Sequence, residues 1–216
     1  MTGSWKVKPL TVDHLPQVVA AHLRSFPNFF LTFLGPAFLR EFYRGVPHDP
    51  EGIGYVAQDE DGAVLGVIVG AVDPPRYFQR LFRRRWWAFG LASIRALAKK
   101  PTILPRLLRA IFYRGEPLAG PSRSLLSSVA VVPEAQGRGV GAALVQAWIH
   151  EVRARGSQGC YLTTDAEHND SVNRFYRHLG WTFHSSHRTP EGRRINCFVL
   201  DFAVADVATP PKRRAA

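Results

Sequence analysis

Cysteine is one of the rarest residues in this chain of 216 amino acids, which contains only Cys160 and Cys197. Two cysteines in apolar runs do not make the framework of several disulfides that stabilises small secreted domains, so we expect reduced thiols. Long apolar runs are absent as well, because the longest candidate, residues 86–94, is bounded by arginine on both sides. A membrane-spanning helix needs about 20 apolar residues, and residues 1–10 lack the apolar core of a signal peptide. The sequence therefore predicts a cytoplasmic protein without a transmembrane helix.

Acidic residues are missing from the segment 76–115, which holds eleven lysines and arginines. This count equals the formal net charge of the whole chain, +11, so the positive excess is concentrated in one place. Three interpretations stay open: helices in peripheral contact with an anionic membrane, a basic wall for a phosphorylated acceptor, or an insertion that covers a sheet edge. No helix-turn-helix, zinc or RNA-recognition motif accompanies the charge, so we expect no specific nucleic-acid partner.

Chain length and apolar content predict the domain organisation. The sequence is 46% apolar, which is enough to bury a core, and its length fits one domain. We expect that domain to span residues 1–205, with residues 76–122 as a basic helical insertion. The end of the chain is rich in proline, lysine and arginine, and we expect residues 206–216 to be a disordered tail.

The spacing of apolar residues predicts strands and helices in alternation. Thr11 is placed to cap the first helix, and Gly62 lies in a turn sequence typical of a hairpin. The predicted strands cover residues 5–10, 54–58, 64–72, 125–132, 160–164, 181–184 and 195–202, and the predicted helices cover residues 11–23, 29–43 with a break at Gly35, 142–155 and 169–179. This order predicts a mixed α/β fold, in which a twisted central sheet carries helices on both faces.

A glycine-rich loop between a predicted strand and a predicted helix, Gln136 to Ala142, is typical of an anion site. Its three glycines let bare backbone approach a ligand closely, and the first N–H groups of the helix lack partners within the helix. The loop is not a Walker A motif, because no Gly-Lys-Ser/Thr follows, and it lacks the full Gly-x-Gly-x-x-Gly of dinucleotide-binding proteins. The pattern favours a pyrophosphate ligand other than ATP or NAD.

Two motifs in the same order resemble the GCN5-related N-acetyltransferase (GNAT) superfamily. Gln136, Gly139 and Gly141 fill its first signature, and Asn169 stands seven residues before Tyr176 as in its second. The resemblance implies a mostly antiparallel sheet that splays where the strand from residue 125 meets the strand from residue 160, with acetyl-CoA in the splay. It also implies an acyl-CoA-dependent N-acetyltransferase.

Site residues follow from the resemblance, position by position. The main chain of three strand residues would pair with the pantetheine arm, and seven loop residues would hold the pyrophosphate. Those residues are Val129, Ala130 and Val131 for pantetheine, and Gln136, Gly137, Arg138, Gly139, Val140, Gly141 and Ala142 for pyrophosphate. Asn169 would contact the pantetheine, and the Val131 N–H would stabilise the oxyanion. Tyr176 would be the general acid, because the departing thiolate needs a proton that a nearby phenol can supply. This chemistry needs no metal ion.

The general base is less clearly marked. Many protein-acetylating members of the family carry a glutamate five residues before the asparagine, and this chain has Thr164 there. Asp165, the next residue, is our candidate, although strand alternation points it away from Thr164 unless the strand has ended. Four other ionisable residues stay open as alternatives: Glu134, Asp73, His14 and His22.

The acceptor is predicted from the region between the first strand and the hairpin. Residues 25–36, rich in phenylalanine, resemble acetyltransferases of polysaccharide and sugar-nucleotide pathways, which implies a small-molecule amine such as an amino sugar. Two alternatives remain open: an O-acyltransferase or longer-chain acyltransferase at the membrane surface, and a non-catalytic acyl-CoA-binding module. A monomer and a homodimer are equally compatible with the sequence.

Overall fold

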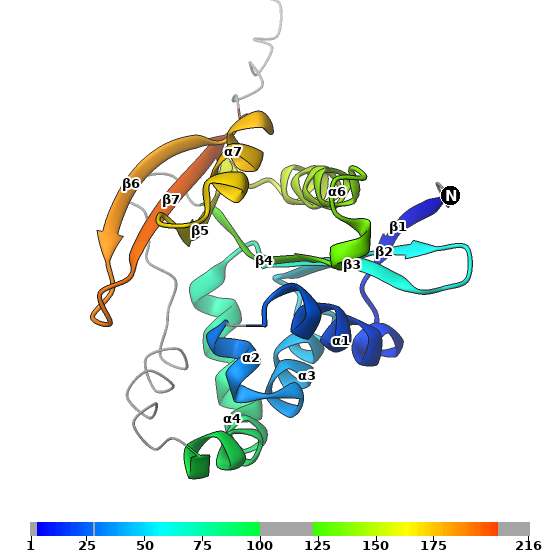
Figure 1. Cartoon of the computed structure of the whole chain (residues 1–216), viewed down its shortest axis with the longest axis vertical. Coiled ribbons are helices and arrows are strands. Elements are labelled where there is room, and N and C mark those ends of the chain that lie inside the picture. Colours follow the sequence, from blue (N-terminus) through cyan, green and yellow to red (C-terminus); the bar gives the residue numbers. More distant parts are fainter. Residues whose placement is uncertain (1–3, 28, 100–122, 203–216) are drawn as a thin grey trace, which may run out of the picture.

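A single open sheet organises the chain (Figure 1). The computed structural model describes residues 4–27, 29–99 and 123–202. Within them the strands are β1 (Trp5–Pro9), β2 (Gly52–Asp59), β3 (Val64–Ala71), β4 (Ser124–Val131), β5 (Gly159–Asp165), β6 (Thr182–Arg188) and β7 (Arg194–Asp201). Their spatial order is β1-β2-β3-β4-β5-β7-β6, and every neighbouring pair is antiparallel except β4 and β5. The predicted mixed, mostly antiparallel α/β fold is confirmed.

Helices cover both faces of this sheet. One face carries α1 (Leu15–Ser25), α2 (Phe30–Leu34), α3 (Pro36–Gly45) and α4 (Pro74–Lys99), whereas α6 (Val140–Ala154) packs on the other face. The helix α7 (Asp170–His178) lies beside β6, and short 3-10 turns precede α1 (η1, Val12–His14) and α6 (η3, Pro133–Ala135). The break between α2 and α3 falls at Gly35, whose φ of +93° is a conformation that favours glycine.

The strand β3 shows why the sheet is covered on both sides. Val67 and Val69 belong to the core under α1 to α4, and Ile68, which alternates with them, belongs to the core under α6. A strand buried on both faces is apolar throughout instead of alternating with polar residues. Gly70 lies on the Ile68 side, where a Cβ atom would come within 2.5 Å of the Trp148 ring. Glycine at this position therefore lets α6 pack closely on the sheet.

Most element boundaries differ from the sequence prediction by one to four residues, and two of these differences have a clear cause. α6 begins at Val140 rather than Ala142, because Gly139 takes a φ of +81° and serves as the N-cap. β6 continues to Arg188 rather than ending at residue 184, because pairing with β7 extends its polar half. The predicted insertion is helical through Lys99, and its remaining residues and the predicted tail, 206–216, lie outside the described residues. No helix of the described residues is long and apolar enough to cross a membrane.

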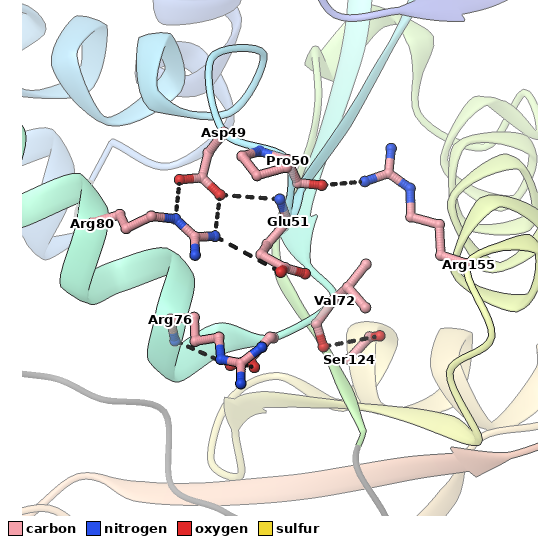
Figure 2. Close-up of polar contacts among 9 residues, drawn as sticks. Asp49, Pro50, Glu51, Val72, Arg76, Arg80, Ser124 and Arg155 are labelled. Carbon is pink, nitrogen blue, oxygen red and sulfur yellow. Dashed lines mark hydrogen bonds and ion pairs between the residues drawn. The ribbon is translucent and has the colours of Figure 1, made fainter.

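The first half of α4 is fixed by ion pairs to the turn that precedes β2 (Figure 2). Arg80 donates to both carboxylate oxygens of Asp49 at 2.7 and 2.8 Å and lies 3.9 Å from Glu51. Burial alone raises the pKa of Asp49, but hydrogen bonds from Arg80 and from the Glu51 amide more than reverse this and leave the pKa below its ordinary value. Asp73 accepts a hydrogen bond from the Arg76 amide at the start of the helix. Part of the basic charge of this segment therefore holds the fold together.

Replacing Arg80 with methionine should destabilise the protein by about 2–3 kcal/mol, because Asp49, only 6% exposed, would lose its charged partner. At pH values above the ordinary pKa of aspartate, the ionised Asp49 carboxylate stabilises the folded state. This contribution is lost as the pH falls through the lower pKa that Asp49 has in the folded protein. The difference between variant and parent should therefore shrink in acid. Urea unfolding at several pH values measures it, with Arg83→Met as control, because Arg83 is exposed. An equal decrease in the free energy of unfolding of the Arg80 and Arg83 variants would contradict this role of Arg80.

Candidate active site

The sheet splits between β4 and β5. These parallel strands pair only through Ser124 with Cys160 and Leu125 with Tyr161, so the edge of β4 beyond Leu125 has no partner in β5. Opposite that edge, β4 contains a bulge, because Ser127 is skipped in the register between β4 and β3. The predicted splay is therefore present at the predicted pair of strands.

A cavity of about 500 Å³ lies in this split. Its walls come from β4, β5, α7, the β6–β7 hairpin and the segment that joins α1 to α2. The lining residues are Phe26, Phe29, Leu31, Leu126, Ser127, Ser128, Val129, Tyr161, Leu162, Thr163, Thr164, Asp165, Asn169, Val172, Tyr176, Ser185, His187, Thr189, Arg193, Ile195 and Cys197. The cavity thus joins Val129 of β4 to Asn169 and Tyr176, which lie about forty residues or more further along the chain. No residue of the glycine loop, Gln136 to Ala142, lines it.

The end of β4 directs main-chain groups into the split. The Val132 N–H donates to the Leu65 carbonyl of β3 at 2.9 Å, and successive residues of a strand point their polar groups to opposite edges. The N–H and carbonyl of Val131 therefore face away from β3. That carbonyl accepts hydrogen bonds from Ser25 and from the Gln136 side chain, each at 3.0 Å. Gln136 thus joins the glycine loop to the strand before it.

The glycine loop has the geometry of an anion cradle. Gly137 and Gly139 have φ values of +73° and +81°, and a Cβ atom at either position would meet nothing within 4 Å. Arg138, between them, is exposed. The first helical hydrogen bond to Gly139 comes from the Ala143 amide at 3.0 Å, so the amides of residues 140–142 precede the regular bonding of α6. Unhindered backbone and helix N–H groups together suit a pyrophosphate.

The remaining predicted donor-site residues take different positions around the split. Val129 lines the cavity, whereas Ala130 is buried and pairs with Val67 of β3. Asn169 also lines the cavity as the N-cap of α7, and its side chain donates to the Thr164 hydroxyl at 2.8 Å and to the Asp165 carbonyl at 3.2 Å. Asn169 therefore ties the end of β5 to the start of α7.

Tyr176 lies on α7, and it is buried and lines the cavity. Its ring packs against Phe175, Trp181 and Phe198, with centroid distances of 5.2 to 6.3 Å. Burial raises the pKa of Tyr176, because an apolar environment disfavours the phenolate. The hydroxyl therefore stays protonated at neutral pH, as a proton donor must.

Asp165 is the one residue among the five base candidates that lines the cavity. It ends β5, and it lines the cavity together with Thr164, so the alternation of the strand does not turn it away. Arg193 donates to both of its carboxylate oxygens, with its closest contacts at 2.7 Å. The guanidinium of Arg193 lies over the Phe29 ring, 5.9 Å from its centroid. The Asp165 carboxylate is thus held by Arg193, which lies next to the Phe29 ring of the cavity wall.

The other four candidates have partners elsewhere. Glu134 pairs with Arg24 at 2.7 Å, Asp73 caps α4, and the His14 ring contacts Thr11. His22 is fully buried, and burial lowers its pKa to about 4, so it is neutral at neutral pH. Its Nδ1 lies 2.7 Å from the hydroxyl of Tyr43, which also bonds to the cavity residue Ser128. The His22 ring also packs against Phe26 of the cavity wall, 5.0 Å between centroids, but His22 itself does not line the cavity.

Sequence reasoning missed the wall that the β6–β7 hairpin contributes. Ser185, His187, Thr189, Arg193 and Ile195 all line the cavity, yet no motif marks them. They reach the split because β7 pairs antiparallel with β5, which places Ile195 opposite Asp165 and brings Arg193 to the Asp165 carboxylate. Aligning the predicted closing strands with β5 would have been the only sequence signal for this wall.

The acetyltransferase (GNAT) family model matches residues 15–181. The chain belongs to this family. Its members are acyl-CoA-dependent acetyltransferases that use acetyl-CoA as co-substrate, so this GNAT protein is an acyl-CoA-dependent acyltransferase that acts with an acceptor substrate. Among the described residues, no group of three or more histidine, cysteine or acidic side chains could hold a metal ion.

Solved structures share the GNAT fold. SsHAT is 21% identical, with a TM-score of 0.68 over 92% of this chain and 98% of its own. The polyamine N-acetyltransferase of Drosophila melanogaster is 19% identical, with a TM-score of 0.59 over 92% and 100%. The ribosomal-protein-S18-alanine N-acetyltransferase of Escherichia coli is 16% identical, with a TM-score of 0.58 over 95% and 99%. At these identities the similarity shows the fold alone. No curated protein sequence matches.

Proposed function

We propose that this GNAT protein transfers an acetyl group from acetyl-CoA to the primary amine of an amino sugar carried on a nucleotide. The observation that carries this proposal is the chemistry of the cavity wall formed by Phe26, Phe29 and the β6–β7 hairpin. That wall combines aromatic side chains with basic ones, and the one carboxylate of the cavity lining, Asp165, is already paired with Arg193. An acceptor with a flat or ring-shaped body and an anionic group fits such a wall.

The donor would occupy the β4 side of the split. The loop residues Gln136 to Ala142 would surround its pyrophosphate, and the exposed edge of β4 from Val129 to Val131 would bond its pantetheine arm. Asn169 would contact the same arm from α7. Support for this placement comes from the open glycine positions and from the β4 edge that β5 leaves unpaired.

The reaction is a direct displacement at the thioester. The amine nitrogen attacks the acetyl carbonyl, a C–N bond forms, the C–S bond breaks, and the thiolate takes the hydroxyl proton of Tyr176. The Val131 N–H would stabilise the oxyanion. Asp165 would accept the proton that the attacking nitrogen loses, with Arg193 fixing the orientation of its carboxylate.

A polycationic acceptor fits this cavity poorly. The Drosophila protein is a polyamine acetyltransferase by name, and a polyamine needs carboxylates along its length. Here the cavity face of the β6–β7 hairpin carries His187 and Arg193 and no carboxylate. Because side chains alternate along a strand, Arg188 and Arg194, which pair with each other, lie on the opposite face of the hairpin. The cavity face with His187 and Arg193 is the proposed site of the acceptor's nucleotide phosphates.

Replacing His187 with alanine should raise KM for UDP-glucosamine about tenfold or more and leave KM for free glucosamine unchanged. The reason is that only the nucleotide-linked sugar carries phosphates to which the imidazole, a cavity-lining group, can donate a hydrogen bond. Steady-state release of the CoA thiol measures both constants. The matched control is Arg188→Ala, which removes a side chain on the opposite face of the same strand.

Two results would contradict the proposed acceptor. One is a higher kcat/KM for spermidine than for the nucleotide-linked sugar. The other is an equal rise of KM for linked and free sugar in the His187 variant, because that pattern indicates general damage to the hairpin. A dodecanoyl-CoA donor and a hydroxylated acceptor in the same assay distinguish the longer-chain and O-acyl alternatives.

A further inference from the structure

The helix α4 exposes an apolar surface that the rest of the described chain does not cover. Trp86, Trp87, Leu91 and Ile94 are 69%, 55%, 62% and 56% exposed. Trp87, Leu91 and Ile94 follow one another at spacings of four and three residues, so they form a single stripe along the helix. We call these four residues the α4 apolar surface. A stripe of exposed Trp87, Leu91 and Ile94, with the exposed Trp86 beside it, indicates contact with a partner.

The opposite face of α4 already packs on the protein. Tyr77, Phe78, Leu81 and Phe89 are buried in the core shared with α1 and α3. From Trp86 to Ile94 the helix therefore has large apolar side chains both towards the core and towards solvent. Packing on the sheet, one of the interpretations that the sequence leaves open, explains the buried face and leaves the exposed face without a role.

The charges next to the α4 apolar surface have one sign. Arg76 and Arg83 continue its stripe towards the start of the helix, and Arg84 flanks it. Arg83 and Arg84 have no ion pair within the described residues, unlike Arg80, which Asp49 and Glu51 hold (Figure 2). The helix from Pro74 to Lys99 contains no acidic residue. The solvent-exposed face of α4 thus carries arginines towards the start of the helix and tryptophans further along it.

A groove beside this face has the same character. It has a volume of about 840 Å³, runs between α1, α3 and α4, and is walled by Pro16, Val19, Trp87 and Leu91 with arginines at its rim. The rim arginines are Arg40, Arg44 and Arg85, and Glu41 pairs with Arg85 and Arg44. Apolar walls with a basic rim match a lipid, which has acyl chains and an anionic phosphate.

We propose that the α4 apolar surface docks this protein on a bilayer containing anionic phospholipid. Tryptophan rings lie at the level of the headgroups in membrane interfaces, and nearby arginines attract an anionic leaflet. The charge complementarity favours a bilayer over a second copy of this chain, because two copies would bring Arg83 and Arg84 of each close together. The docking does not depend on which acceptor the cavity takes.

The test is flotation of the full chain with phosphatidylcholine vesicles, with and without phosphatidylglycerol. We expect binding to the mixed vesicles, at least about tenfold weaker binding to phosphatidylcholine alone, and release at high salt. Trp86→Ser with Trp87→Ser should reduce binding to mixed vesicles about tenfold or more. The matched control, Val12→Ser with Phe183→Ser, removes two exposed apolar side chains outside α4 and should bind like the parent.

Charge variants separate the contribution of the arginines from that of the apolar side chains. Arg83→Glu with Arg84→Glu should weaken binding only to the mixed vesicles, whereas Lys6→Glu with Lys8→Glu on β1 should not. Absence of binding to mixed vesicles would overturn the proposal, as would equal losses in the tryptophan variant and its control. A dimer in sedimentation velocity that the tryptophan variant dissociates without vesicles would instead assign the surface to self-association. Circular dichroism confirms that each variant is folded.

Discussion

Turnover should fall about 10²- to 10⁴-fold when Tyr176 is replaced with phenylalanine, while the affinity for acetyl-CoA stays unchanged. The substitution keeps the ring that packs against Trp181 and Phe198 and removes only the hydroxyl. Without the Tyr176 hydroxyl, the thiolate leaves with no proton donor nearby, so we expect the variant to have a lower kcat. Steady-state kinetics and calorimetric titration of the same preparations measure the two quantities.

Tyr77→Phe is the matched control for this prediction. Tyr77 on α4 is also a buried tyrosine whose hydroxyl has no hydrogen-bond partner among the residues that the structure describes, and it lies outside the cavity lining. Its removal should leave turnover and acetyl-CoA affinity at the parent values. Full activity in Tyr176→Phe would contradict the assignment of the general acid. An unaltered protein that binds acetyl-CoA and turns over no acceptor would instead favour a non-catalytic acyl-CoA-binding module.

The Kd for acetyl-CoA should rise about a hundredfold or more when Gly139 is replaced with glutamate. Two effects act together in this variant. A residue with a Cβ is strained at a φ of +81°, and the new carboxylate lies where the pyrophosphate would sit, so like charges repel at short range. Because the N–H groups of α6 would no longer meet the pyrophosphate, binding should be lost before any chemistry. Calorimetric titration with acetyl-CoA measures this change.

Gly156→Glu provides the control at the other end of α6. Gly156 also has a positive φ, +78°, and open space around it, so the backbone strain and the added charge are closely matched. It follows the last turn of the helix, far along the chain from the loop. We expect its Kd to equal that of the parent. Equal losses in both variants would mean that strain in α6, and not the loop, controls the affinity.

The local parts of this molecule could be predicted from the sequence. The glycine loop and the position of Tyr176 are marked by residue types at short spacing, because an anion cradle and a helix start are built from consecutive residues. The hairpin of β2 and β3 is equally local, and its turn glycine, Gly62, has the expected positive φ of +81°. Such features depend on a few neighbouring residues, so the sequence alone specifies them.

The rest of the site depends on strand register. Arg193 meets Asp165 because β7 pairs with β5, and no pattern near either residue indicates that contact. The start of α6 was placed two residues late because the sequence alone does not show that Gly139 takes the N-cap conformation. Asp165 shares the cavity with Thr164 at the end of β5, where the alternation of a regular strand no longer decides the side. Contacts made by long-range strand pairing and side-chain directions at strand ends therefore could not be predicted from the sequence.

Acetyl transfer itself is the most direct test of the account. The full chain would be incubated with acetyl-CoA and UDP-glucosamine, and the sugar nucleotide and the released CoA would be quantified by mass spectrometry. The account predicts a sugar nucleotide heavier by one acetyl group, formed in an amount equal to the free CoA. An unmodified sugar nucleotide, with or without release of CoA, would contradict it.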